Sequence, residues 1–244
     1  MQDSRRNVFF RIAAILLLVV LIVGVLCDLT YYIFRNVTYS SFIWGRNSVF
    51  SNFNFSNLIS FLSETVPMIR SVFGAVFALL IVVMLFASKE KVAGKLIIVS
   101  SVILYVLYVT SYVLNFIAAQ MNNSLSSYLQ ATVWTLIKNT VMLAVLILFG
   151  LLLTGVFKSG SKVFAFILCG IFAVSVIVTL FEFIMAIPSS AYVFQNGDAF
   201  YKVSTIVSRI AQIMGCVRYT AYSLCCLGVA LKPRESVKTE PEIS

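Results

Sequence analysis

The sequence predicts an all-α fold, a polytopic membrane bundle of six transmembrane helices with the N-terminus and the C-terminus both in the cytoplasm. Of its 244 residues, 61% are hydrophobic and 11% are charged, whereas soluble domains have roughly 45–50% apolar and about 25% charged residues. Six apolar stretches, each long enough to cross ~30 Å of hydrocarbon as a helix, take up most of the chain. We therefore expect it to fold in lipid.

The six stretches form a single transmembrane domain at residues 1–231. The spans are expected at about residues 12–34, 66–87, 96–119, 131–157, 163–187 and 203–231. Residues 35–65 form an outer segment rich in aromatic residues, in which helical spacing is followed by Phe55, Leu58, Ile59 and Leu62. We expect this segment to anchor the bundle in the headgroup layer, with a lid or a partner surface as the alternative. The tail at 232–244 mixes charged residues with two prolines and is expected to be disordered in the cytoplasm.

The basic residues predict the orientation, because short cytoplasmic loops of membrane proteins are rich in Lys and Arg. Such residues precede the first span and lie between the second and third and the fourth and fifth spans: Arg5, Arg6, Arg11, Lys89, Lys91, Lys95, Lys158 and Lys162. Two of the three segments expected outside, 120–130 and 188–202, contain only Asp198 and Lys202 as charged residues. The net charge of +9 therefore reflects topology, and we expect no nucleic acid as a partner.

The residue types missing from the chain bear on its chemistry. The sequence contains no histidine, and its five cysteines all fall in apolar stretches. Imidazole metal sites and Ser-His or Cys-His catalysis need histidine, and a disulfide framework would need cysteines in the outer loops. We expect no metal site, no cofactor and no catalytic residue, so that the protein is not an enzyme.

Charged residues inside the spans are the strongest functional pointers, since a charge in hydrocarbon is costly unless it is paired or hydrated. Counting from the cytoplasmic boundaries puts four of them near the outer interface, where long side chains extend to the headgroups: Arg70, Lys138, Glu182 and Arg209. Glu182 is expected to form a structural ion pair with Lys138 or Arg209, which lie at matching heights. A charged vestibule for an anionic or zwitterionic ligand is the alternative.

Arg218 is expected deeper, roughly 20 Å from the cytoplasmic boundary at 1.5 Å per residue, and Asp28 is the first acid to test as its partner. Two polar stripes support a polar interior, because spacings of three and four residues place each stripe on one helix face. The third span carries Ser101, Tyr105, Tyr108, Tyr112 and Asn115, and the sixth carries Ser208, Gln212, Gly215, Tyr219 and Tyr222. A plain packing seam between helices is the alternative interpretation.

These observations favour a small-molecule transporter or permease-like protein in the cell membrane, with a polar interior formed by the third and sixth spans. The expected partners are the lipid bilayer and a small-molecule ligand or a membrane protein. As the alternative, the chain is a non-catalytic membrane subunit or scaffold that binds a partner protein through its outer aromatic segment or its tail.

Overall fold

The computed structural model describes residues 2–38, 55–121, 125–157 and 161–231. Within these ranges the chain is almost entirely helical and contains no β-strand. Its helices, in chain order, are α1 (Gln2–Thr38), α2 (Phe55–Phe86), α3 (Glu90–Met121), α4 (Leu125–Thr154), α5 (Ser161–Met185), α6 (Ile187–Asn196) and α7 (Ala199–Ala230). Six segments of the described chain are long and apolar enough to cross a membrane, with α5 and α6 together forming one of them. The prediction of an all-α chain with six such segments is confirmed.

Several helices extend beyond the apolar stretches predicted from the sequence. The clearest difference is α2, which begins at Phe55 rather than near residue 66, so residues 55–65 of the expected outer segment belong to a membrane helix. An apolar stretch shows only which part of a helix crosses the hydrocarbon. The helix continues beyond that part, because each residue added at either end forms a further backbone hydrogen bond. The rest of the outer segment, 39–54, and the tail, 232–244, lie outside the described residues.

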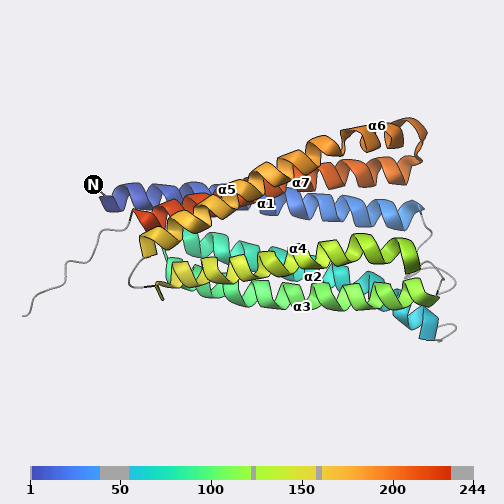
Figure 1. Cartoon of the computed structure of the whole chain (residues 1–244), viewed down its shortest axis with the longest axis horizontal. Coiled ribbons are helices and arrows are strands. Elements are labelled where there is room, and N and C mark those ends of the chain that lie inside the picture. The colour runs from blue at the N-terminus through green and yellow to red at the C-terminus, as the bar shows by residue number, and fades with distance from the viewer. Residues whose placement is uncertain (1, 39–54, 122–124, 158–160, 232–244) are drawn as a thin grey trace, which may run out of the picture.

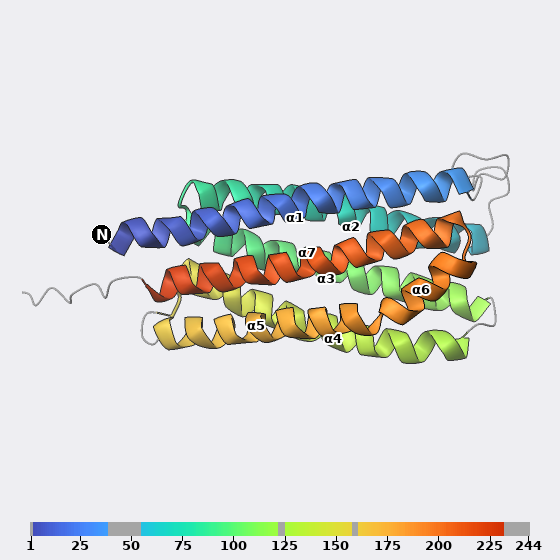
Figure 2. The same cartoon turned by 90° about the horizontal axis from the view of Figure 1, so that it is seen from above.

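The helices form two layers of three (Figures 1 and 2). One layer has the order α1, α7, α5, with α6 continuing α5, and the other has the order α2, α3, α4. Contact between the layers is closest along α1 and α2, while α4 touches α5 and α7 at fewer places. The middle helices, α3 and α7, have no close backbone approach among the described residues.

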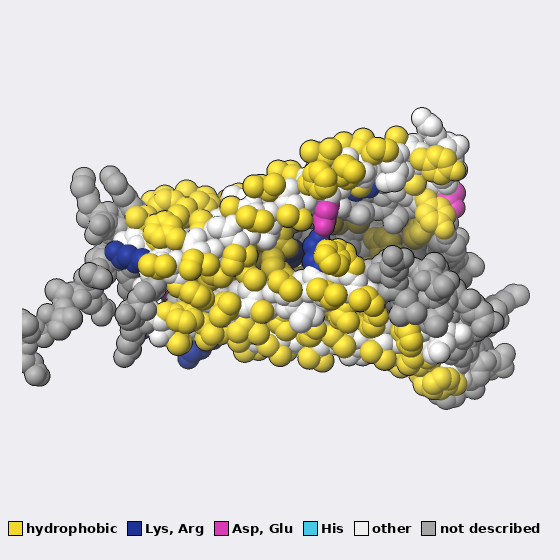
Figure 3. Space-filling model, viewed as in Figure 1, with side chains coloured by type: hydrophobic (Ala, Val, Ile, Leu, Met, Phe, Trp, Pro, Cys, Tyr) yellow, Lys and Arg dark blue, Asp and Glu magenta, His cyan; other side chains and the backbone are white. Residues whose placement is uncertain are grey.

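Exposed basic residues gather at one end of the bundle, which we call the basic end: Arg11, Lys89, Lys91, Lys95 and Lys162. The N-terminus of α1 and the C-terminus of α7 also lie there (Figure 1). Elsewhere the face seen in Figure 3 is covered mainly by apolar side chains, as expected for a surface in contact with lipid.

The buried core lies toward the basic end and joins both layers. Its members come from every membrane-spanning helix: Phe10, Ala13, Ala14, Leu17, Val82, Leu85, Ala93, Ile97, Val145, Phe149, Leu152, Leu153, Ala165, Leu168, Phe172, Ala221, Cys225, Cys226 and Ala230. The Phe149 and Phe172 rings meet edge to face, with centroids 5.4 Å apart, and Tyr222 of α7 packs 5.1 Å from Phe149. Cys225 and Cys226 are buried free thiols, whereas Cys27, Cys169 and Cys216 are partly buried.

Two glycines let α3 and α4 touch backbone to backbone. A Cβ atom on Gly94 would lie 2.6 Å from the carbonyl oxygen of Gly150, and one on Gly150 would lie 2.8 Å from that of Gly94. Close approach through small residues is how helices gain packing energy in lipid, where the surrounding acyl chains are as apolar as the helix surface.

The turns that end α2 and α4 at the basic end are alike. At the end of α2 the amide of Lys89 donates to the Met84 carbonyl and that of Ser88 to the Leu85 carbonyl. The amides of Val156 and Gly155 donate in the same pattern at the end of α4. Each motif needs one residue in the left-handed region, here Ser88 at φ 54° and Gly155 at φ 80°. These tight ends align α3 and α5 antiparallel to the helices before them.

Substitution at Gly150 tests the α3–α4 contact. Gly150→Val should lower the free energy of unfolding by about 1–3 kcal/mol, because the new methyl groups would force two backbones apart. Gly170 provides a matched control, since a Cβ there meets no atom within 4 Å, and Gly170→Val should change stability by less than about 0.5 kcal/mol. Thermal unfolding in detergent measures both, and equal midpoints would contradict the described contact.

Candidate functional site

A partly open cavity of about 530 Å³ lies between the two layers. Its walls come from α1, α2, α3, α4 and α7, so it fills the space where α3 and α7 do not meet. Leu17 and Ile97, which belong to the core, line its floor toward the basic end. The cavity thus begins where the packing between the layers stops.

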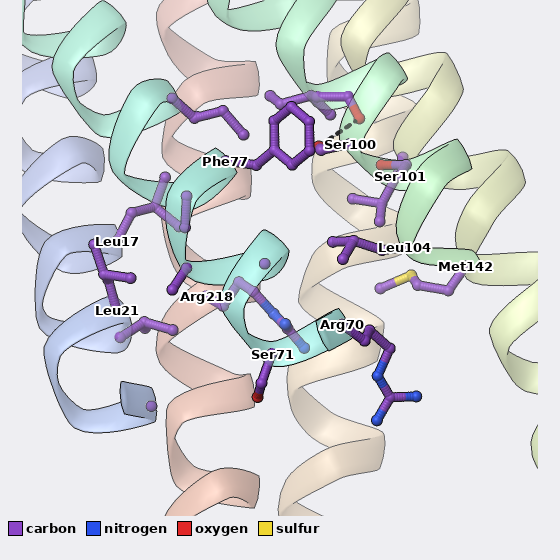
Figure 4. Close-up of a pocket in the computed structure, with 18 of the residues that line it drawn as sticks. Leu17, Leu21, Arg70, Ser71, Phe77, Ser100, Ser101, Leu104, Met142 and Arg218 are labelled. Atoms are coloured by element: carbon purple, nitrogen blue, oxygen red, sulfur yellow. Dashed lines mark hydrogen bonds between the residues drawn. The ribbon is translucent and has the colours of Figure 1, made fainter. Parts of the chain in front are cut away.

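The cavity wall is mixed in character. Apolar side chains dominate it, and its polar and charged members are Asp28, Arg70, Ser71, Ser100, Ser101, Tyr105, Tyr108, Asn139, Arg218, Tyr219 and Tyr222. The close-up in Figure 4 shows Arg70 and Ser71 on α2, Ser100 and Ser101 on α3, and Arg218 on α7. Mostly apolar walls with a few placed polar groups are typical of small-molecule sites.

Arg218 contacts an aromatic ring and, among the described residues, no acid. Its guanidinium carbon lies 5.5 Å from the ring centroid of Tyr219, within the ~6 Å range of a cation–π contact. Among the described residues no carboxylate forms an ion pair with it. Its charge therefore faces the cavity without a counter-charge from this part of the chain.

Arg70 is in the same situation on α2. Its guanidinium carbon lies 5.7 Å from the ring centroid of Tyr108, and it too has no ion pair with any described carboxylate. From the sequence we expected Arg70 near the outer interface, and by helical rise it lies about 24 Å from the end of α2 at Phe86. The sequence did not predict that its side chain lines the cavity at that level.

Asp28 lines the cavity but does not pair with Arg218. Its Oδ2 accepts a hydrogen bond from the Ser71 hydroxyl of α2. The heights explain this: α1 and α7 share a level where Gly228 lies against the Phe10 ring. From there, at 1.5 Å per residue, Asp28 lies about 27 Å and Arg218 about 15 Å toward the other end. The pairing suggested by the sequence is therefore wrong in the described structure.

The two polar stripes divide between the cavity and its surroundings. Ser101, Tyr105 and Tyr108 of α3 and Tyr219 and Tyr222 of α7 line the cavity. The Tyr105 hydroxyl is also hydrogen-bonded to that of Thr140 on α4, at 2.7 Å. Of the predicted set, Tyr112, Asn115 and Gln212 lie nearer the outer ends of α3 and α7 and are not part of the wall.

Lys138 and Glu182 form the expected ion pair. Lys138 Nζ on α4 lies 2.6 Å from Glu182 Oε1 on α5, and the two side chains are 48% and 40% exposed. The pair connects the two layers on the edge opposite α1 and α2, where backbone contact between the layers is sparse. It therefore holds the layers together next to the cavity without belonging to its wall.

Arg209 is engaged elsewhere, at the break between α5 and α6. Its guanidinium donates to the Ser190 hydroxyl at 2.8 Å, to the Gln212 amide oxygen at 2.8 Å and to the Ala186 carbonyl at 2.9 Å. Pro188 in the first turn of α6 supplies no amide hydrogen there. Arg209 and Gln212 thus stabilise a kinked helix, and Arg209 is not a partner of Glu182.

Sequence reasoning missed Arg70, Ser71 and Asn139 as members of the wall. Ser71 and Asn139 each follow a charged residue, Arg70 and Lys138, in an otherwise apolar run, and polar neighbours of an intramembrane charge are a signal that could have found them. In the described residues no group of three or more His, Cys, Asp and Glu side chains is placed to hold a metal ion.

Comparisons of the chain with models of known protein families, with curated proteins and with solved structures returned no match.

A double-mutant cycle tests the ion pair. Lys138→Met or Glu182→Met alone should cost about 1–3 kcal/mol of stability, because each leaves a charge in an apolar layer without its partner. The double variant should recover most of this loss, and so should the exchange Lys138→Glu with Glu182→Lys. Thermal unfolding in lipid nanodiscs measures the coupling. Additive costs of the two single variants would show that the residues act independently.

Proposed function

We propose that this chain is a multi-pass protein of the cell membrane that transports a small molecule, with the cavity between α3 and α7 as its binding site. The observation that carries the proposal is a cavity of about 530 Å³ with charged and tyrosine side chains inside an otherwise apolar bundle. Ligand pockets have volumes of about 300–1,000 Å³. Charged side chains within membrane helices generally face a ligand or ion pathway.

The arrangement of the layers supports transport rather than simple storage of a ligand. Transporters bind their substrate near the middle of the membrane and expose it to each side in turn by rocking one helix bundle against another. Here the layers are packed together toward the basic end and separate around the cavity. Sparse contact along α4 and α5 leaves one edge where they could move apart.

The orientation is part of the proposal. Exposed lysines and arginines gather at the end of the bundle that holds the two termini of the described chain. Positive residues are retained on the cytoplasmic side during insertion. We place the basic end in the cytoplasm, which makes the cavity accessible from the outer half of the membrane.

The alternative, a membrane subunit that binds a partner protein, used the outer aromatic segment and the tail as its docking surfaces. Both surfaces lie largely outside the described residues. No described contact favours this alternative over transport, and it stays a prediction that native co-purification of a partner would support.

Filling the cavity should stop transport. Gly24 lines the cavity and a Cβ there would meet no atom within 4 Å, so Gly24→Phe should place its ring in the open space of the cavity. Gly170→Phe, at a similarly open position outside the wall, is the control. In proteoliposomes screened with carboxylates, amino acids, phosphate esters and sugars, any solute taken up by the parent protein should lose at least tenfold in rate with Gly24→Phe alone. Equal rates in the two variants would remove the cavity from the pathway.

A reporter fused after Ser244 tests the orientation. Alkaline phosphatase folds only outside the cytoplasm and green fluorescent protein fluoresces after cytoplasmic synthesis, so the second fusion alone should be active. Active phosphatase at this position would reverse the orientation and expose the cavity to the cytoplasmic side.

A further inference from the structure

The described charges on the cavity wall do not balance. Arg70 and Arg218 contribute two positive charges, and Asp28 contributes one negative charge whose oxygen already accepts a hydrogen bond from Ser71. A charge within the apolar layer is costly without a partner. An excess positive charge at this depth therefore favours a negatively charged ligand.

The way each arginine is held leaves its hydrogen-bond donors available. Arg218 and Arg70 lie over the rings of Tyr219 and Tyr108, and among the described residues no hydrogen bond or ion pair uses the donors of either guanidinium. A guanidinium donates through N–H groups in its plane, which match the two oxygens of a carboxylate or phosphate. Within the described part of the chain these donors are therefore available to a ligand.

The two arginines lie at different depths. Asp28 and Ser71 are in contact, so Arg70 lies at the level of Asp28, about 12 Å nearer the outer end than Arg218 by helical rise. An anion that enters from that end meets Arg70 first and Arg218 afterwards. Positive charges in sequence along a narrow site raise the local concentration of an anion and its rate of entry.

We infer that the ligand of this cavity carries a carboxylate or phosphate group that Arg218 binds, with Arg70 attracting it from the outer end. The inference rests on the proposed function for the cavity and names its ligand class. The anionic group belongs to a water-soluble solute or to a lipid headgroup, since both present the same oxygens to a guanidinium.

Binding of simple probes tests the ligand class in the full-length protein. In nanodiscs of phosphatidylcholine, inorganic phosphate, pentanoate, pentanol and pentylamine are titrated by isothermal calorimetry. Pentanoate or phosphate should bind, pentanol should bind at least tenfold more weakly, and pentylamine should not compete. Preferential binding of pentylamine would overturn the inference.

Variants locate the binding group. Arg218→Gln should weaken anion binding at least tenfold, while Lys202→Gln, which removes the same charge near the outer end of α7 but outside the wall, should change it less than twofold. Asp28→Asn should tighten anion binding, since it removes a negative charge from the wall. If Arg218→Gln does not fold, comparing Gly24→Phe with Gly170→Phe also tests whether the anion binds in the cavity. Unchanged binding with an altered or filled wall would refute the site.

Nanodiscs that contain an anionic lipid distinguish a lipid headgroup from a water-soluble solute as the ligand. In nanodiscs that contain one tenth phosphatidylglycerol, native mass spectrometry should show a retained anionic lipid that is lost with Arg218→Gln if the ligand is a headgroup. Retained lipid should then displace pentanoate and phosphate. Soluble anions that bind equally in both kinds of disc indicate a water-soluble ligand. Absence of binding in both arms would refute the inference.

The inference of an anion site and the proposal of transport can fail separately. Anion binding without uptake in proteoliposomes would leave the inference intact and remove transport. Uptake of a cationic or neutral solute that Gly24→Phe blocks would keep transport and overturn the anion site.

Discussion

The packed core toward the basic end is the constraint on which the rest of the structure depends. Helices in lipid gain little from hiding apolar surface, so they associate where small residues and well-shaped side chains allow close packing. Here Gly94 and Gly150 bring two backbones together, and the rings of Phe149, Phe172 and Tyr222 join α4, α5 and α7. Because these contacts lie toward one end, the layers are packed together there and enclose the cavity beyond it.

The polar side chains of the bundle fall into two groups with different partners. Many hydroxyls bond to carbonyls of their own helix, as Thr30 does to Leu26, Thr110 to Val106 and Thr179 to Ser175, which satisfies them wherever they lie. An arginine has five donors and cannot be satisfied this way. Arg209 donates to the carbonyl of Ala186, where α5 ends and α6 begins. Arg70 and Arg218 instead contact tyrosine rings on the cavity wall. The difference in partners separates a structural arginine from the two for which we propose an anionic ligand.

The number of spans could be predicted from the lengths of the apolar stretches, and residue spacing placed several polar side chains of the cavity wall on common helix faces. Spacings of three and four residues placed Tyr105 with Tyr108 and Tyr219 with Tyr222 on common faces, and all four line the cavity. Depth was harder to predict, because it depends on where a helix begins and which neighbour it meets. The prediction for Arg70 gave its depth but not the cavity on whose wall it lies, and Asp28 was matched to Arg218 without knowledge of the level at which α1 packs on α7. Tertiary register of this kind is set by contacts such as Gly228 on Phe10, which no single helix encodes.

The path of the chain through the two layers bears on how the proposed transporter would move. The chain changes layer between α1 and α2 and again between α4 and α5. Where the chain first changes layer, α1 packs closely along α2. Where it changes layer again, α4 and α5 make few contacts, and the Lys138–Glu182 ion pair connects them. A charged pair at about 2.6 Å is strong at short range and loses most of its energy after a separation of a few ångströms in a hydrated gap. In the proposed transport, the α1–α2 edge would therefore act as the hinge, and the α4–α5 edge would open when the ion pair separates. The arginines of the cavity wall lie between these two edges.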